Sequence, residues 1–373
     1  RSVSAFLLNR SSDLSFDQFG KYNLRIRKML EVVYTDMTIS HDTDEFKALE
    51  IYLKRIWFSS GIYHHYGCEK FKPGFTAEYL YQVLKDADAR RLPLNEGETI
   101  QQMCDELFPV IFDETVWPKR VNKADGEDLL MTSACNFYDG VTQAEAEAFY
   151  QQQKQQDEHQ DTPPSFGLNS TLVKEDGQIK EKVWSANGKY ARAIRHIIYW
   201  LEKASEAAEN EQQKRVIKSL ISYYQTGDLQ IFNEYCIEWL KDQDSSIDFI
   251  NGFIEVYGDP LGLKGSWEGL VEYIDEEATH RTQTISRNAQ WFEDHSPVDP
   301  RFRKPVVKGV SANVICAAML GGDEYPSTAI GINLPNADWI RAQYGSKSIT
   351  ISNITDAYNK AAHGNGFKEE FVI

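Results

Sequence analysis

The stretch Phe249–Gly269 reads Phe-Ile-Asn-Gly-Phe-Ile-Glu-Val-Tyr-Gly-Asp-Pro-Leu-Gly-Leu-Lys-Gly-Ser-Trp-Glu-Gly. Its first residues are mostly apolar and predict a strand, which the glycines and the proline between 258 and 265 end abruptly. Alternation along this strand places Glu255 and Tyr257 on the same face. A carboxylate and a phenol at the rigid end of a strand are typical of a functional site. The alternative is a surface acid beside an interfacial tyrosine, and the pattern alone leaves both interpretations open.

The composition indicates an acidic globular protein. Its 373 residues are enough for two or three domains, or for one large discontinuous domain. With 42% hydrophobic and 12% aromatic residues, the chain can build real cores. The net charge of −16 argues against a nucleic-acid partner, because phosphate binding needs a basic face. The same charge mildly favours cationic ligands, such as the free amine of a peptide.

The sequence carries no sign of a membrane segment. No apolar run approaches the ~20 residues that span a bilayer, so no membrane partner is expected. No signal peptide is recognisable, which favours a cytoplasmic location. The chain begins Arg1-Ser2-Val3 without a methionine, so an internal start and a removed export signal stay open. The sequence leaves the oligomeric state open as well.

Residue types that often bind metals are scattered along the chain. The five cysteines are Cys68, Cys104, Cys135, Cys236 and Cys316. Their number is odd and no CxxC or CxxxC spacing occurs, so we expect buried, reduced thiols. The adjacent His64 and His65 have no third ligand nearby, and Glu276, Glu277 and His280 lack a second histidine motif. We assign no metal ligand within the chain.

Hydrophobic periodicity predicts mostly helices before residue 245. Apolar residues at spacings of three and four make residues 1–60 helical. Thr142-Gln-Ala-Glu145 is a capping box that opens another helix. Asp176-Gly177, between two β-prone runs, predicts a hairpin across 171–184. Further helices are expected near 188–208, 210–225, 228–242 and 266–292.

A second stretch, Ala329–Arg341, reads Ala-Ile-Gly-Ile-Asn-Leu-Pro-Asn-Ala-Asp-Trp-Ile-Arg. It predicts a short strand that ends at Asn333, and Pro335 cannot continue a central ladder. Asn333 and Asn336 would then cluster at a strand edge, where amides can grip the main chain of another peptide. Asparagines that merely serve a turn are the alternative.

Taken together, Phe253–Gly262 and Gly331–Asn336 resemble the substrate-binding segments of dipeptidyl peptidase III. This is a two-lobed family of zinc exopeptidases. The resemblance runs across most of the chain, including the hairpin, His295-Ser-Pro and Asn353–Phe367. Within the family, the chain resembles bacterial members of the Bacteroides type.

The resemblance implies an α+β fold that is mostly helical, with a small β-barrel core and part of a two-lobed architecture. Residues 1–274 would supply helices and barrel strands of the lower lobe. Residues 275–317 would be a helical excursion toward the upper, zinc-carrying lobe. Residues 318–373 would return to the barrel and begin the segment that leads to the zinc helices.

The resemblance also implies roles for single residues. Glu255 matches the acid that holds the free N-terminal ammonium of the substrate, and Asn333 and Asn336 complete that grip. Tyr257 matches the catalytic tyrosine, whose hydroxyl stabilises the oxyanion and the scissile carbonyl. The other expected substrate-binding residues are Ala329, Ile332, Asp338 and Arg341. Oligopeptides with a free N-terminus would bind as an added strand on the barrel and lose a dipeptide.

The sequence departs from the family at the metal. The family's zinc motif reads His-Glu-x-x-Gly-His, with a further glutamate on a second helix, and this sequence contains no His-Glu pair. Zinc is therefore expected in the full-length protein but not on residues of this chain. We expect the chain to be an amino-terminal portion that is inactive alone. A metal-free peptide-binding module and a helical scaffold are the rival interpretations.

Overall fold

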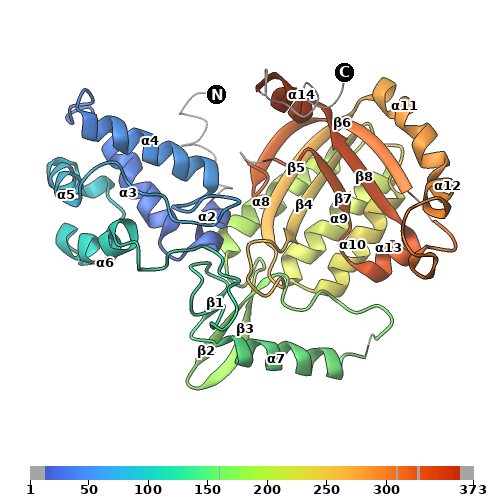
Figure 1. Ribbon diagram of the computed structural model, residues 1–373, viewed down its shortest axis with the longest axis horizontal. Coiled ribbons are helices and arrows are strands. Elements are labelled where there is room, and N and C mark those ends of the chain that lie inside the picture. The colour runs from blue at the N-terminus through green and yellow to red at the C-terminus, as the bar shows by residue number, and fades with distance from the viewer. Residues whose placement is uncertain (1–12, 159, 308–309, 326–327, 362–373) are drawn as a thin grey trace.

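The computed structural model describes residues 13–361, except 159, 308–309 and 326–327. The described chain is a mixed α+β protein in three parts that follow one another in sequence (Figure 1). Helices occupy the amino-terminal end, a small sheet with one long helix follows, and a five-stranded sheet with its helices forms the rest.

The amino-terminal part is built from helices that pack around one apolar core. They are α2 (Asp13–Phe19), α3 (Asn23–Thr35), α4 (Asp44–Ser59), α5 (Ala77–Asp86), the 3₁₀ helix η2 (Ala89–Arg91) and α6 (Ile100–Phe112). Ile26, Leu30, Leu49 and Leu53 lie fully buried between α3 and α4, at the spacings of three and four that predicted these helices. The helical prediction for residues 1–60 is confirmed for the residues that the structure describes.

The small sheet has the order β1-β2-β3, with β1 (Tyr138–Asp139), β2 (Ser170–Glu175) and β3 (Gln178–Val183). The predicted hairpin is confirmed, and both turn residues have positive φ, 51° at Asp176 and 77° at Gly177. Such a turn matches the twist of the strands that it joins. The helix α7 (Gln143–Gln156) begins with the predicted capping box on Thr142 and packs against this sheet.

Three helices then pack against the large sheet. They are α8 (Ala191–Glu206), α9 (Glu211–Thr226) and α10 (Leu229–Lys241), close to the predicted bounds. Their apolar faces share one core with the sheet, which includes Leu220, Trp239 and Phe253. Burial of these faces, rather than helix propensity, is what stabilises helices of this length.

The large sheet has the order β4-β5-β6-β8-β7. Its strands are β4 (Ile247–Glu255), β5 (Ser266–Ile274), β6 (Val310–Gly322), β7 (Gly331–Leu334) and β8 (Ser346–Ile351). The remaining elements are α11 (Glu276–Arg287), α12 (Ala289–Asp294), the 3₁₀ helix η3 (Pro300–Phe302), α13 (Asp338–Tyr344) and α14 (Ser352–Ala361). Strand β7 pairs with β8 and lies at an edge of this sheet, as Pro335 predicts.

The helix predicted near 266–292 is wrong in its first part. Residues 266–274 form β5 instead of the start of a helix, because burial there alternates with period two: Leu270 and Glu272 are buried, whereas Val271 and Tyr273 are exposed. Backbone pairing with β4 on one side and β6 on the other completes this strand. Only the later part of the predicted helix, from Glu276 to Asp294, is helical, as α11 and α12.

The predicted small barrel is an open sheet in the described part of the chain. Strands β4 and β7 are its two edges and do not pair with each other there. The segment 275–317 also differs from a purely helical excursion, because strand β6 begins at Val310. The segment 318–373 returns to the sheet through β7 and β8, and its residues from 362 onward lie outside the described part.

Candidate functional site

The ends of β4 and β7 meet at one wall of a pocket of about 620 Å³. Glu255, Tyr257 and Asn336 line this pocket together. The amide Nδ2 of Asn336 donates a hydrogen bond of 3.3 Å to the carboxylate Oε1 of Glu255. Tyr257 follows β4 in a turn, and its side chain is 77% exposed. The two stretches that the sequence singled out therefore contribute to one concave site.

The rest of the pocket wall is mostly apolar. The loop at Pro163–Phe166 forms one side, and Phe232 and Trp239 of α10 form another. The carbonyl of Pro163 accepts a hydrogen bond of 3.0 Å from the indole of Trp339 in α13, which ties the loop to the segment after β7. Concave, mainly apolar pockets with a few polar groups are typical of ligand sites.

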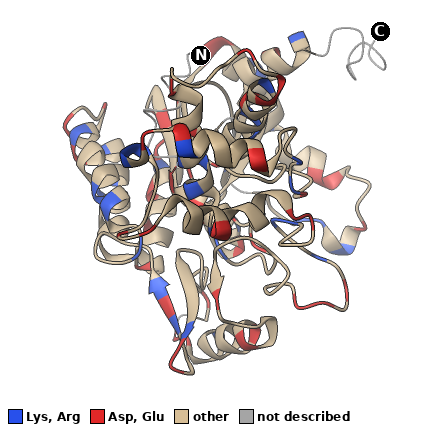
Figure 2. Cartoon of the chain, turned by 90° about the vertical axis from the view of Figure 1, so that its left-hand side faces the viewer, with Lys and Arg blue, Asp and Glu red and all other residues tan. Residues whose placement is uncertain are grey.

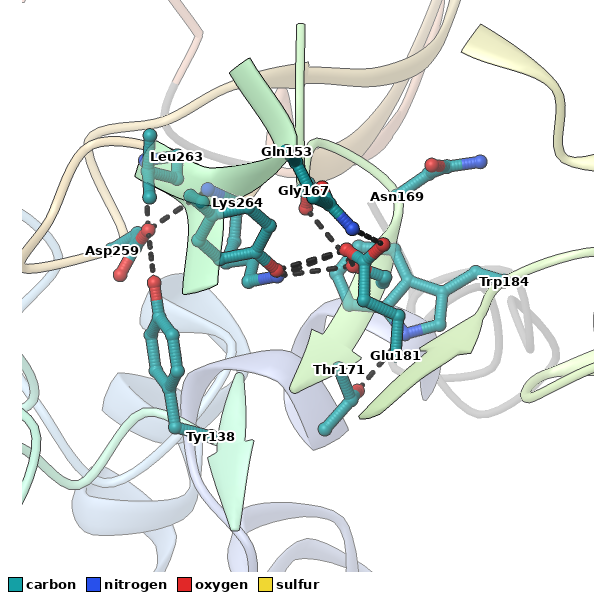
Figure 3. Close-up of polar contacts among 12 residues, drawn as sticks. Tyr138, Gln153, Gly167, Asn169, Thr171, Glu181, Trp184, Asp259, Leu263 and Lys264 are labelled. Carbon is teal, nitrogen blue, oxygen red and sulfur yellow. Dashed lines mark hydrogen bonds and ion pairs between the residues drawn. The ribbon is translucent and has the colours of Figure 1, made fainter. Parts of the chain in front are cut away.

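The loop that follows Tyr257 is held by the buried carboxylate of Asp259. This carboxylate accepts hydrogen bonds from the backbone N–H groups of Leu261, Leu263 and Lys264, and one of 2.9 Å from the Tyr138 hydroxyl of β1 (Figure 3). Burial raises the pKa of Asp259, and these hydrogen bonds oppose the rise. The loop is thus anchored to the small sheet, and Tyr257 stands on a rigid support.

A buried lysine continues this network on the side of the small sheet. The ammonium of Lys264 bonds the hydroxyls of Tyr150 and Ser170, and Glu181 of β3 lies 3.9 Å away (Figure 3). Burial lowers the pKa of Lys264 to about 8, with Glu181 opposing. Lys264 is fully buried and its contacts lie away from the pocket, so it joins the loop to the small sheet.

Acidic groups gather behind Glu255. Burial raises the pKa of Glu255, the Asn336 hydrogen bond opposes this, and the charge of Asp323 adds to it. Glu268 and Glu324 are 3% and 8% exposed, and the pKa values of both are raised, chiefly by burial. Helical spacing in the sequence places Glu268 on a predicted helix, so sequence patterns do not single it out. Its burial within strand β5 reveals it, because a buried glutamate is rare and costly.

The other predicted substrate-binding residues lie around the β7 edge. Asn333 is exposed on β7, Ile332 beside it is partly buried against the core, and Ala329 is exposed just before the strand. Asp338 and Arg341 lie on α13. In the described part of the chain, the pocket wall includes Asn336 but none of these five residues.

The histidines and glutamates considered as metal ligands form no metal site in the described part of the chain. The His64 ring accepts a hydrogen bond from the N–H of Gly67, and burial lowers the pKa of His65 to about 4. Between residues 13 and 361, outside the short gaps, no group of three His, Cys, Asp or Glu side chains is arranged to hold a metal. The zinc that the resemblance implies for the whole protein thus finds no fitting donor set here, and we derive no step through it.

On the side that Figure 2 shows, Lys and Arg are interspersed with Asp and Glu along the ribbon. Among the described helices, none is long and apolar enough to cross a membrane.

The described chain is a mixed α+β protein with a concave pocket at the ends of β4 and β7. Two solved structures share this fold: dipeptidyl peptidase III from Caldithrix abyssi, with a TM-score of 0.64 and 18% identity, and that from Corallococcus sp. strain EGB, with 0.59 and 19%. The comparisons cover 94% and 96% of this chain, and 53% and 56% of those chains.

The sequence comparisons agree. The family model described as Peptidase family M49 matches residues 133–370. Dipeptidyl peptidase 3 of Rattus norvegicus and of Homo sapiens are each 22% identical over 329 residues, which covers 83% of this chain and 44% of each relative. The chain belongs to peptidase family M49. It spans less than half the length of these curated relatives.

Proposed function

We propose that this chain is the substrate-binding part of a zinc-dependent peptidase that releases dipeptides from the free N-terminus of oligopeptides. The observation that carries the proposal is the Glu255–Asn336 pair, which places a carboxylate with raised pKa and an amide at the wall of a peptide-sized pocket. A charge-assisted contact to the terminal ammonium would fix the end of the peptide and thus the number of residues removed.

The edge strand β7 offers backbone groups that a bound peptide can pair with. Its outer edge is unpaired in the described sheet, so a peptide can add to it as a further strand. Glu255 and Asn336 lie at the carboxyl-terminal end of β7. A peptide whose amine is held there and which lies along β7 must therefore run antiparallel to it. Asn333 would face its main chain, and Ala329 and Ile332 would flank it.

Tyr257 is the proposed catalytic residue of the whole protein. Its hydroxyl would donate a hydrogen bond to the oxygen of the scissile carbonyl as negative charge develops there. Asp338 and Arg341, on α13, would contact the substrate beyond the edge strand. We propose that this chain alone binds peptides without hydrolysing them. Dipeptide release by the purified chain would overturn that part of the proposal.

Titration calorimetry with a free-amine tetrapeptide and its N-acetylated form tests the binding role. We expect the free amine to bind and acetylation to weaken binding at least about tenfold, because the charged hydrogen bond is lost. Glu255→Gln should weaken the free-amine peptide similarly. Glu276→Gln, an exposed glutamate at the start of α11, is the matched control and should change nothing. Equal binding of both peptides to the unmodified chain would refute the role.

A further inference from the structure

Four carboxylates gather where β4, β5 and β6 end, and Glu255 of the amine site is one of them. Glu255 pairs with Ser266 across the sheet, and Glu268 lies two residues further along β5, so Glu255 and Glu268 share a face. Glu268 pairs with Gly252 on one side and with Gly322 on the other. Because both partners lack side chains, the Glu268 carboxylate has no neighbouring side chain directly across either strand.

The other two members follow Gly322 immediately. The N–H of Asp323 donates a hydrogen bond of 2.9 Å to the carbonyl of Trp267, the residue before Glu268. Glu324 then points into the same interior. It is 8% exposed and its Oε2 has no hydrogen-bond partner. Its charge acts on Glu268, and the charge of Glu255 acts on Glu324 in turn. An unpaired carboxylate oxygen at this depth costs free energy unless a proton or a cation satisfies it.

The surrounding elements supply little positive charge. Arg120 acts on Asp323, and His65 lies 3.9 Å from the Asp323 carboxylate but is held neutral by burial. Burial raises the pKa of Tyr66, and the charges of Glu324 and Asp323 add to the rise. Further along β5, the charge of Glu324 raises the pKa of Glu272 and the charge of Lys347 lowers it. The Lys347 ammonium also donates a hydrogen bond of 2.7 Å to Asp248. Among the described residues, no positively charged side chain acts on Glu255, Glu268 or Glu324.

We propose that Glu255, Glu268, Asp323 and Glu324 form one cluster that shares protons. Entry of the substrate's ammonium at Glu255 displaces a proton from this cluster. Glu324 is the member that becomes charged. The proposal rests on the proposed function, because Glu255 is the group that contacts the amine. The peptide enters as ammonium, one carboxylic acid of the cluster becomes a carboxylate, and its proton passes to the buffer. Glu324 acts through Glu255 and is a positioning residue.

The electrostatic reason is that one added cation lets the cluster carry one more negative charge. Burial and the neighbouring carboxylates raise the pKa of Glu324 to about 7, so part of the population is protonated near neutral pH. An ammonium at Glu255 favours the charged form and drives that proton off. Peptide affinity must then rise with pH, by at most about tenfold per pH unit for one linked proton, until the cluster is charged. It falls again as the peptide amine itself deprotonates, above about pH 8.

The test is titration calorimetry of this chain with the free-amine tetrapeptide at about pH 6.5, where the amine is fully charged. Repeating it in buffers of different ionisation enthalpy counts the protons released. We expect fractional proton release for the unmodified chain and almost none for Glu324→Gln, with affinity about fivefold lower at neutral pH because one negative charge is lost. The matched control Glu276→Gln should release protons like the unmodified chain.

The possible outcomes distinguish failure of the proton-sharing cluster from failure of the proposed function. Absence of proton release by the unmodified chain overturns the cluster, and this needs no variant. Unchanged release by a folded Glu324→Gln chain, checked by circular dichroism, overturns the assignment to Glu324. If Glu255→Gln binds the free-amine peptide as tightly as the unmodified chain, the proposed function fails instead.

Discussion

The amide of Asn336 bonds the carboxylate of Glu255 across 3.3 Å and so joins the end of β7 to the end of β4. These residues are 81 positions apart in the sequence. The bond places a charged group and the free edge of β7 at one corner of the pocket. In the proposed function, the same corner receives the substrate's first residue.

Replacing Asn336 with alanine tests the contribution of its amide to peptide binding. We expect Asn336→Ala to weaken free-amine peptides by about fivefold, because one hydrogen bond to the amine site is lost. The variant should fold normally, since the Asn336 side chain is exposed. Titration calorimetry measures the change, and an affinity equal to that of the unmodified chain would contradict it. The N-acetylated peptide should show no comparable loss.

Removing the Asp259 carboxylate should loosen the loop behind Tyr257. Asp259→Ala leaves three backbone N–H groups and the Tyr138 hydroxyl without their acceptor, so we expect a loss of about 3 kcal/mol in the free energy of unfolding. Tyr138→Phe removes only one of these bonds and should cost about 1 kcal/mol. Urea unfolding measures both. Equal losses for the two variants would show that Asp259 does not organise the loop.

The buried Glu272 predicts a pH-dependent stability. Burial raises its pKa to about 8, far above the value of about 4.3 in an unfolded chain. Between these values the folded state binds more protons than the unfolded state, so Glu272 destabilises the fold progressively as pH rises. Glu272→Gln should therefore raise the thermal midpoint at pH about 8 but hardly change it near pH 4.5. A midpoint gain that is the same at both pH values would contradict this.

Tyr257 predicts a separation of binding from catalysis. In the proposed full-length peptidase, Tyr257→Phe should lower kcat by about 10²-fold while KM changes little, because in the proposed role the hydroxyl acts on charge that develops only in the transition state. In this chain alone, the same change should leave peptide affinity nearly unaltered. Steady-state kinetics and calorimetry provide the two readouts. A variant that loses affinity but keeps kcat would assign Tyr257 to binding instead.

Local signals in the sequence predicted much of the fold. Asp176-Gly177 fixes its hairpin because both residues adopt positive φ, and Thr142 with Glu145 fixes the start of α7. Pro335 likewise places β7 at an edge. These features depend on neighbouring residues alone. Strand alternation does not relate Glu255 to Tyr257, because β4 ends at Glu255 and Tyr257 lies in the turn that follows. Both residues nevertheless line the same pocket.

Features set by distant partners were missed. Val271 and Tyr273 are exposed while Glu272 is buried, so apolar and charged residues in β5 face the opposite way from the usual pattern. The two flanking strands decide this, and the spacing of the apolar residues fits a helix equally well. The open form of the sheet depends on which strands pair, and the acidic cluster depends on the turn after Gly322 meeting β5. Neither the open sheet nor the acidic cluster can be predicted from a short stretch of sequence.

The most direct test of the account is a crystal structure of this chain with a bound free-amine tetrapeptide. We expect the terminal ammonium within about 3 Å of the Glu255 carboxylate, and the peptide main chain antiparallel along β7. A peptide bound away from Glu255, or with its amine pointing into solvent, would contradict the central claim.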